Sequence, residues 1–178
     1  EVREDTKRTI ALTLFRSFEY IIQPSSKQDY SNKKGSQCLG KQIFNIAVYP
    51  HKGDWSNGNV YEEAMNYSYP VRLAQSGKAT GKLKPLTSFM EIEPKEIIFS
   101  CFKRSEDNDG TFILRMYNPT NKTINGALNF LNSISEAWIV TLEELEVSKI
   151  RLTSSNSIKF KAERKKIISI KLKFKGNI

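Results

Sequence analysis

The residues best suited to chemistry lie together in one short segment, residues 48–55, which reads V-Y-P-H-K-G-D-W. It contains His51, the only histidine of the chain, and Trp55, one of two tryptophans. A histidine can act as an acid or a base near neutral pH, but a catalytic centre needs further groups in defined roles. The segment therefore belongs either to a small binding protein or to a loop of a larger active site.

The rest of the chain has too few suitable residues for a metal site or for a catalytic nucleophile. One histidine and the distant Cys38 and Cys101 fall short of the ligand set of a zinc site, and no G-x-S-x-G motif supplies a serine nucleophile. Residues 35–41 have the spacing of a phosphate-binding loop, but Gln42 replaces the hydroxyl residue that binds Mg²⁺. Residues 107–110 lack the final glutamate of a calcium loop and instead predict a hairpin turn.

Aromatic residues near His51 suit contact with a carbohydrate. The C–H faces of a sugar stack on aromatic rings, and its hydroxyls need hydrogen-bond donors and acceptors. The alternative is that His51 is a hydrogen-bonded turn residue beside Trp55. The residues that make this segment aromatic are Tyr49, Trp55, Tyr61, Tyr67 and Tyr69.

The composition is that of a globular, sheet-rich protein. Of 178 residues, 39% are hydrophobic, and ten are Phe and seven Tyr, which favours β-structure over long helices. No apolar run approaches the roughly 18 residues of a membrane span, and residues 1–5 resemble no signal peptide. We therefore expect a cytoplasmic protein with no membrane partner. Its two cysteines are expected to be free, with one disulfide as the alternative.

The net charge of +9 does not by itself indicate nucleic acid as a partner. Near the C-terminus, Ile168, Ile170, Leu172 and Phe174 alternate with Ser169, Lys171, Lys173 and Lys175. This period of two predicts a strand with one face buried and a lysine face in water, where it prevents edge-to-edge association. No aromatic residue stands among the lysines on the exposed face to stack bases, so we expect no nucleic-acid partner.

Short strands separated by turns predict an antiparallel β-sandwich, with a domain boundary near residues 90–96. One helix is predicted over residues 59–67, where Asn59 is the cap and Glu62 stands three residues on. Residues 143–149 are ambiguous between a strand and a helical turn. The predicted strands cover residues 9–15, 42–49, 97–103, 112–117, 123–131, 137–142, 157–162 and 166–174.

Six segments occur in a fixed order over roughly residues 9–174. They are A-L-T-L-F-R-S (11–17), G-S-Q-C-L-G (35–40), F-N-I-A-V-Y-P-H-K-G-D-W (44–55), A-M-N-Y-S-Y-P (64–70), F-S-C-F-K-R-S-E-D (99–107) and F-I-L-R-M-Y-N-P (112–119). Together they resemble the C-terminal region of the α-mannosidases of glycoside hydrolase family 38, in their bacterial and archaeal form.

The resemblance implies that this chain has an all-β fold and that catalysis takes place in a different domain. In that family an N-terminal α/β barrel carries the zinc ion, an aspartate nucleophile and an acid/base carboxylate, and hydrolysis retains the anomeric configuration. The C-terminal part is a supersandwich like that of galactose mutarotase, followed by smaller sandwiches. Residues 1–94 would then be the later part of the supersandwich, and residues 95–178 a small C-terminal β-sandwich.

The resemblance also implies that this chain has no catalytic or metal-binding residue of its own. Its partners would be the catalytic barrel, with its zinc, and a mannoside substrate; unpaired sheet edges would also suit a homo-oligomer. Arg16, at the end of the L-T-L-x-R strand, would lie close to the sugar, or would instead pair with the barrel. The residues expected beside the substrate are Arg16, His51 and Trp55. The alternative function is a stand-alone carbohydrate-binding β-sandwich.

Overall fold

The computed structural model describes residues 9–18, 34–78, 80–81 and 83–176. The chain divides into two units, Glu1–Val48 and Tyr49–Ile178, which we describe separately. Within the described residues, Cys38 and Cys101 are free thiols. None of the helices in this part of the chain has the length and hydropathy needed to cross a membrane.

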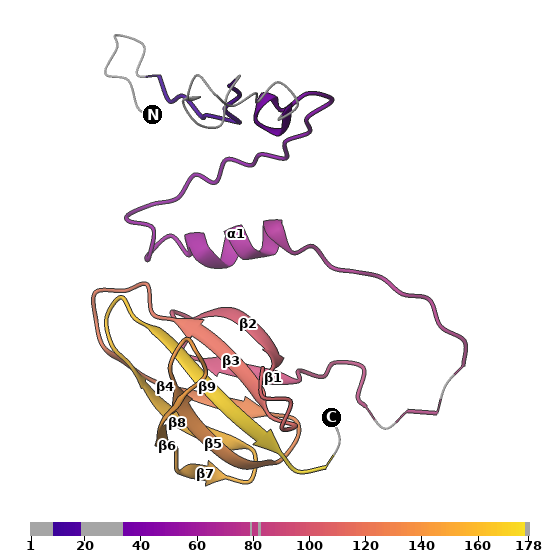
Figure 1. The fold of residues 1–178 in the computed structure, drawn as a ribbon, viewed down its shortest axis with the longest axis vertical. Coiled ribbons are helices and arrows are strands. Elements are labelled where there is room, and N and C mark those ends of the chain that lie inside the picture. Colours follow the sequence, from indigo (N-terminus) through magenta and orange to yellow (C-terminus); the bar gives the residue numbers. More distant parts are fainter. Residues whose placement is uncertain (1–8, 19–33, 79, 82, 177–178) are drawn as a thin grey trace, which may run out of the picture. The chain divides into compact units, whose positions relative to one another are not determined.

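The second unit contains helix α1 (Val60–Ser68) and a β-sandwich of two antiparallel sheets (Figure 1). The four-stranded sheet has the order β1 (Met90–Glu93), β4 (Ile124–Phe130), β8 (Ser157–Ala162), β7 (Leu152–Ser154). The five-stranded sheet has the order β2 (Ile98–Arg104), β3 (Phe112–Tyr117), β9 (Ile167–Phe174), β5 (Ile134–Val140), β6 (Glu146–Lys149). The predicted all-β class and antiparallel sandwich are confirmed.

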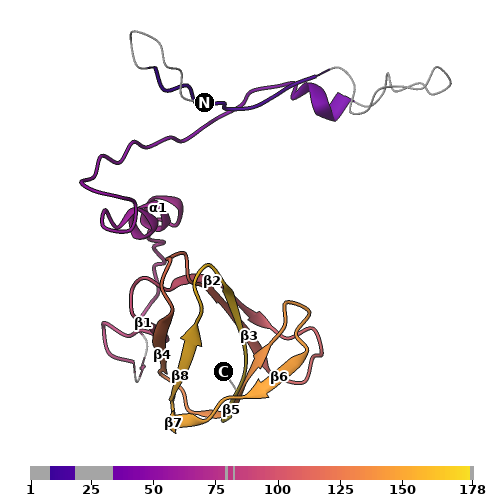
Figure 2. The same ribbon diagram turned by 90° about the vertical axis from the view of Figure 1, so that its left-hand side faces the viewer.

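The core lies between the two sheets, which Figure 2 shows as opposed layers with β4 and β8 on one side and β3 on the other. Leu128 and Ile158 are register partners in the four-stranded sheet, and Leu114 and Ile170 are partners in the five-stranded sheet. All four side chains are fully buried. Alternate residues of each strand thus face the opposite sheet, as in other aligned sandwiches.

Five phenylalanines join the two sheets at one end of the core. Phe102 and Phe112 stack with ring centroids 5.3 Å apart, and Phe130 of the other sheet meets the Phe174 ring edge-on, also at 5.3 Å. The ring centroid of Phe89, just before β1, lies within 6.3 Å of the ring centroids of Phe102, Phe130 and Phe174. Such offset and edge-on arrangements add to the stability gained from burying the rings.

The prediction for the C-terminal lysine strand is wrong in one respect. β9 is a central strand between β3 and β5, and both Ser169 and Lys171 on its outer side are buried. The Lys171 Nζ lies 3.0 Å from a carboxylate oxygen of Asp107 and of Asp109, and 3.8 Å from one of Glu146. The lysine is buried because acidic side chains neutralise it, which the alternating pattern alone does not show.

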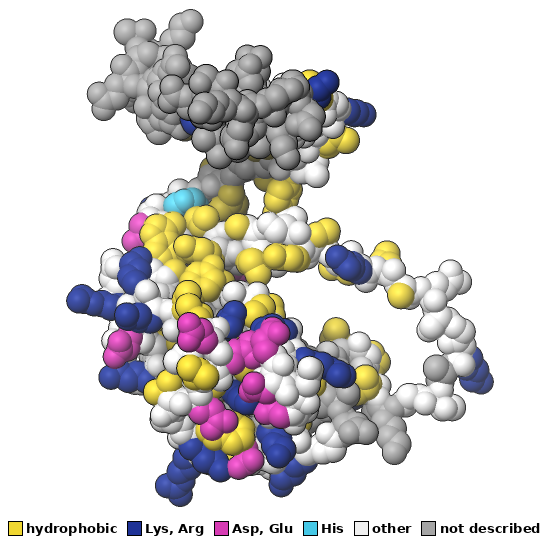
Figure 3. Space-filling view, in the orientation of Figure 1, with side chains coloured by type: hydrophobic (Ala, Val, Ile, Leu, Met, Phe, Trp, Pro, Cys, Tyr) yellow, Lys and Arg dark blue, Asp and Glu magenta, His cyan; other side chains and the backbone are white. Residues whose placement is uncertain are grey.

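The loop after β5 also lies against this outer face. The Glu144 carboxylate is buried, pairs with Lys103 at 2.7 Å and accepts a hydrogen bond from the Glu106 backbone N–H at 2.9 Å, and these contacts lower its pKa. The Arg115 guanidinium donates to the Leu142 carbonyl at 2.6 Å. Figure 3 shows acidic and basic side chains intermingled on this side of the sandwich. The two loops, residues 105–111 and 141–145, therefore form an ionic layer over the sheet.

The first unit differs from the prediction. Residues 9–15 and 42–49, predicted as strands, form none; its described residues show a 3₁₀ helix, η1 (Lys34–Gln37), and a single bridge residue, Ile10. The Phe15 and Phe44 rings stack at 5.9 Å, but most apolar side chains of both segments are exposed. An alternating pattern shows which face of a strand is apolar, yet a strand also needs a partner strand. That these segments belong to a supersandwich stays a prediction.

Most of the predicted strands of the second unit are confirmed within a few residues, as are α1 and the hairpin turn at 108–110. The ambiguous segment 143–149 contains a turn followed by β6. The prediction missed β1 and β7, which are short strands at the edges of the four-stranded sheet. The boundary between residues 94 and 95 stays a prediction.

Replacing Lys171 by glutamine should lower the free energy of unfolding at pH 7 by about 1–3 kcal/mol. A lost partner in a buried ion pair costs up to about 5 kcal/mol, but these carboxylates are partly exposed and solvent reduces the effect. Hydrogen bonds from Thr111, and then Lys171, lower the pKa of Asp109 from 3.8 to about 2. Its stabilising contribution is therefore complete above about pH 4 and is lost as the pH falls toward 2.

Urea unfolding of the wild type and of Lys171→Gln at pH 7 and pH 3 measures this difference, which should be smaller at pH 3. Lys173→Gln, an exposed lysine two residues further along the same strand, is the control. An equal loss in the control, or a difference independent of pH, would contradict the assignment.

Replacing Gly126 by alanine should lower the free energy of unfolding by about 1–3 kcal/mol. A Cβ at this position would lie 2.4 Å from the Phe160 Cζ and 2.7 Å from the Glu93 carbonyl oxygen, and the latter belongs to a paired strand. Gly77→Ala is the matched control because the space around Gly77 is open, and it should change stability by less than about 0.5 kcal/mol. Chemical denaturation of both variants tests the expectation.

Candidate functional site

The segment that contains His51 and Trp55 leads directly into α1. The Asp54 side chain accepts a hydrogen bond from the Asn57 backbone N–H at 2.8 Å, and the Asp54 carbonyl accepts one from Gly58 at 2.9 Å. α1 then begins after Asn59, which has a φ of 55° and whose side-chain amide donates to Glu62 at 2.7 Å. The predicted pair, Asn59 and Glu62, is therefore in contact at the helix start. The contact is between two side chains, whereas in a capping box each side chain accepts from a backbone N–H group.

α1 and the loop before it are attached to the sandwich through aromatic rings and a lysine. The Trp55 ring meets the Tyr61 ring edge-on at 5.2 Å, and Tyr61 meets Tyr117 of β3 at 6.1 Å. The Lys165 Nζ lies 5.3 Å from the centre of the Trp55 ring and donates to the Pro119 carbonyl at 2.5 Å. A cation over an aromatic face and edge-on ring pairs both stabilise such a contact.

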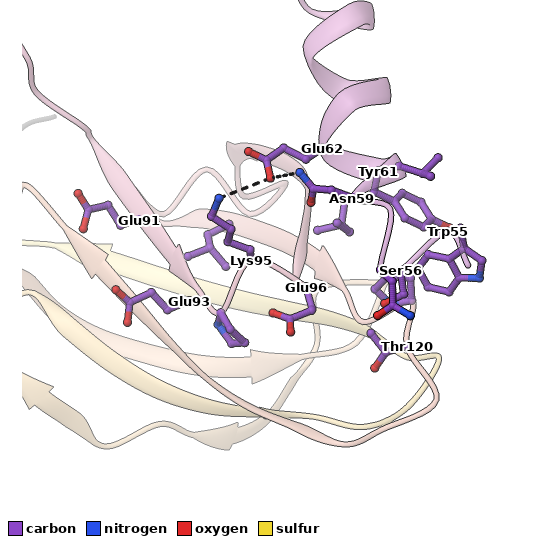
Figure 4. Close-up of a pocket in the computed structure, with 16 residues that line it drawn as sticks. Trp55, Ser56, Asn59, Tyr61, Glu62, Glu91, Glu93, Lys95, Glu96 and Thr120 are labelled. Atoms are coloured by element: carbon purple, nitrogen blue, oxygen red, sulfur yellow. Dashed lines mark hydrogen bonds and ion pairs between the residues drawn. The ribbon is translucent and has the colours of Figure 1, made fainter. Parts of the chain in front are cut away.

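A pocket of about 800 Å³ lies between α1, the preceding loop and β1 (Figure 4). We call it the acidic pocket, because four carboxylates and only one lysine line it, which gives a net charge of −3. Figure 4 shows Lys95 reaching toward Glu62, and their charged groups are 3.7 Å apart. The charged lining residues are Glu62, Glu91, Glu93, Lys95 and Glu96, and the aromatic ones are Trp55 and Tyr61.

The acidic pocket has the features of a carbohydrate contact site. Its volume is within the usual range for ligand pockets. Carboxylates accept hydrogen bonds from sugar hydroxyls, and the rings of Trp55 and Tyr61 can pack against the C–H faces of a sugar. The described residues contain no group of three or more His, Cys, Asp or Glu side chains arranged to hold a metal ion.

A second pocket, of about 510 Å³, borders Tyr61 at the outer face of the five-stranded sheet. We call it the basic pocket, because Arg115, Lys165 and Lys166 line it without any Asp or Glu among the lining residues. Burial, and to a smaller extent Tyr61, raises the pKa of Tyr117 in its wall. The remaining lining residues are Ser100, Asn118, Pro119, Leu142 and Ile167.

The three residues predicted beside the substrate have different surroundings. Trp55 lines the acidic pocket. The ring centroids of His51 and Tyr49 are 6.0 Å apart. His51 also packs against Gly58, where an added Cβ would lie 2.4 Å from the His51 Nδ1. Arg16 is in the first unit, where its carbonyl accepts a weak hydrogen bond from the Cys38 thiol at 3.7 Å. Contact of any of them with a substrate stays a prediction.

Sequence reasoning missed the residues that the sandwich contributes to both pockets. Glu91, Glu93 and Glu96 were not singled out, although E-I-E-P-K-E over residues 91–96 has an unusual density of acids. Tyr117 is far in sequence from Tyr61, and Lys165 from Trp55, and only the fold brings each pair together.

Comparison with known proteins supports the resemblance. Residues 90–173 match the family model described as the glycosyl hydrolases family 38 C-terminal beta sandwich domain. The chain is also similar to a protein of Halalkalibacterium halodurans named "Putative mannosylglycerate hydrolase", with 27% identity over 111 residues. That alignment covers 62% of this chain but only 12% of the relative. The chain therefore spans only a small part of the length of this relative.

Replacing Trp55 by alanine should weaken the attachment of α1 to the sandwich. The variant loses the ring contact with Tyr61 and the cation contact with Lys165, so amide hydrogen exchange in residues 60–68 should accelerate about tenfold while β3 stays protected. Tyr69→Ala, which removes a ring that is 71% exposed, should leave exchange unchanged. Unaltered protection of α1 in Trp55→Ala would show that other contacts hold the helix.

Proposed function

We propose that residues 90–173 are a C-terminal β-sandwich domain of the family 38 glycosyl hydrolases, and that the chain is the C-terminal β-domain region of an α-mannosidase. The observation that carries the proposal is the match of residues 90–173, which coincides with the two-sheet sandwich of β1–β9. The proposed reaction is hydrolysis of terminal α-D-mannosides. Its chemistry would lie in an N-terminal catalytic barrel of the same enzyme.

Retention through two carboxylates and a zinc ion is the proposed mechanism of that barrel. The described residues of this chain do not fit a zinc site, since they bring no three suitable side chains together. We therefore derive no catalytic step from them. Their proposed role is to complete and support the pocket that the barrel forms.

Three residues of this chain are proposed to lie beside the bound sugar. The Arg16 guanidinium would donate two parallel hydrogen bonds, to sugar hydroxyls or to a carboxylate of the barrel. Trp55 would supply an aromatic face, and His51 would hold the turn before it. This part of the proposal rests on the resemblance, and on the position of Trp55 in the acidic pocket.

The second candidate function is that of a stand-alone carbohydrate-binding β-sandwich, with no catalytic barrel in the same protein. The acidic pocket favours it, because aromatic rings and carboxylates line the same depression. The size of the native gene product separates the two candidates, since an enzyme of the proposed kind would be several times longer than 178 residues. A native protein of about 20 kDa would exclude the enzyme.

We also propose that the enzyme acts in the cytoplasm and forms a homo-oligomer. The free thiols of Cys38 and Cys101 suit a reducing compartment. Cell fractionation tests the first part, and light scattering of the full-length protein tests the second.

The full-length enzyme should hydrolyse an aryl α-mannoside, and a zinc chelator should abolish the activity. The name of the Halalkalibacterium halodurans relative makes mannosylglycerate the second substrate to assay. Hydrolysis of neither substrate by zinc-loaded, folded enzyme would contradict the proposal. Activity that survives the chelator would remove zinc from it.

In the same enzyme, Arg16→Ala should lower kcat/KM at least about 100-fold while the melting temperature stays within about 2 °C. The expected loss reflects two charge-assisted hydrogen bonds to the sugar or to the catalytic carboxylate. Arg72→Ala, at an exposed position of the second unit, is the control. Full activity of Arg16→Ala would show that this arginine is not at the substrate.

A further inference from the structure

We propose that the basic pocket beside α1 binds an anionic sugar, that is, a sugar carrying a carboxylate or a phosphate. Neither the family match nor the proposed mannosidase reaction assigns a ligand to this place, and the site would exist in either of the two candidate functions. The inference rests on the charge of the pocket, its free donors and its aromatic wall.

The positive charge of the basic pocket is only partly balanced by the protein. Arg115, Lys165 and Lys166 line it, and among the described residues only Arg115 of the three forms an ion pair, with the Glu144 carboxylate at 3.7 Å. Glu144 is closer to Lys103, at 2.7 Å. The Arg115 Nε is sealed from solvent and has no hydrogen-bond partner among the described residues. An anion in the pocket would supply the missing countercharge.

Several hydrogen-bond donors of the pocket are unused. In the described part of the chain, no hydrogen bond or ion pair engages the Lys166 ammonium, the Ser100 hydroxyl or the Tyr117 phenol. A tyrosine phenol is protonated at neutral pH, and burial raises the pKa of Tyr117 further, so its hydroxyl is available as a donor. A ligand rich in acceptor oxygens, such as a carboxylate or a phosphate on a polyhydroxylated ring, matches this set.

The apolar part of the wall favours a sugar over a bare anion. Tyr61 and Tyr117 place their rings 6.1 Å apart, and Leu142 and Ile167 are each 58% exposed beside them. A sugar ring can pack its C–H groups against such a surface while its anionic group pairs with the lysines. Inorganic phosphate would make only the second kind of contact.

The neighbouring acidic pocket does not suit the same ligand. Tyr61 and Pro119 line both pockets, but the acidic pocket has a net charge of −3 and the basic pocket one of +3. An anionic sugar is repelled from the first and attracted to the second. Binding should therefore weaken as salt screens the lysines.

Calorimetric titration of the 178-residue chain with four compounds tests the proposal. Glucuronate and mannose 6-phosphate should bind, or one of them alone, which identifies the carboxylate or the phosphate as the preferred group. Mannose and inorganic phosphate should bind at least about tenfold more weakly. Absence of binding by both anionic sugars, or equal affinity for mannose or inorganic phosphate, would overturn the proposal.

Lys166→Gln should weaken the binding of the anionic sugar about tenfold without altering the fold, because Lys166 makes no ion pair with any residue that the structure describes. Lys161→Gln is the matched control, since Lys161 is an exposed lysine of β8 outside the pocket. An equal loss of affinity in both variants would overturn the assignment to this pocket. No hydrolysis is measured, so failure here leaves the mannosidase proposal intact, and the reverse also holds.

Discussion

The structure depends on the requirement that β9 be buried on both of its sides. Its inward residues, Ile168, Ile170 and Leu172, fill the core between the two sheets, and its outward residues Ser169 and Lys171 are buried as well. An apolar side chain meets this requirement by packing, but a lysine meets it only if counterions reach it. Burial would lower the pKa of Lys171, yet hydrogen bonds to Asp109 and Asp107 outweigh that effect and raise it.

The two loops of the ionic layer also shape the surroundings of α1. Residues 105–111 and 141–145 approach the sheet from opposite edges, and Arg115 on β3 is hydrogen-bonded to the second of them. Leu142 of that loop lines the basic pocket, together with Tyr117 at the end of β3 and Lys165 before β9. The pocket walls are thus the ends of core strands and the loops that cover them, which is where folds usually place binding residues.

The sequence predicted those parts of the fold whose signals are local. Phe112–Tyr117 and Ser157–Ala162 were recognised because alternation and turn residues specify a strand without reference to its neighbours. The burial of Lys171 was missed because it depends on Asp107, 64 residues away in sequence. The pockets were missed for the same reason: Trp55 was identified from its own segment, but Lys165 reaches it only through the tertiary fold. Residues 42–49 show the opposite error, since a strand-like pattern was present and the described residues provided no partner.

The ionic layer over the five-stranded sheet gives this domain two kinds of cohesion. The interior is held by apolar contact, whereas the covering loops are held by the ion pairs of Glu144 and Lys171. Because Glu144 and Lys171 are buried, dissolved salt screens these pairs less than it screens ion pairs at the surface. The outer face of the sheet is therefore held closed by charge, and its inner face by apolar packing.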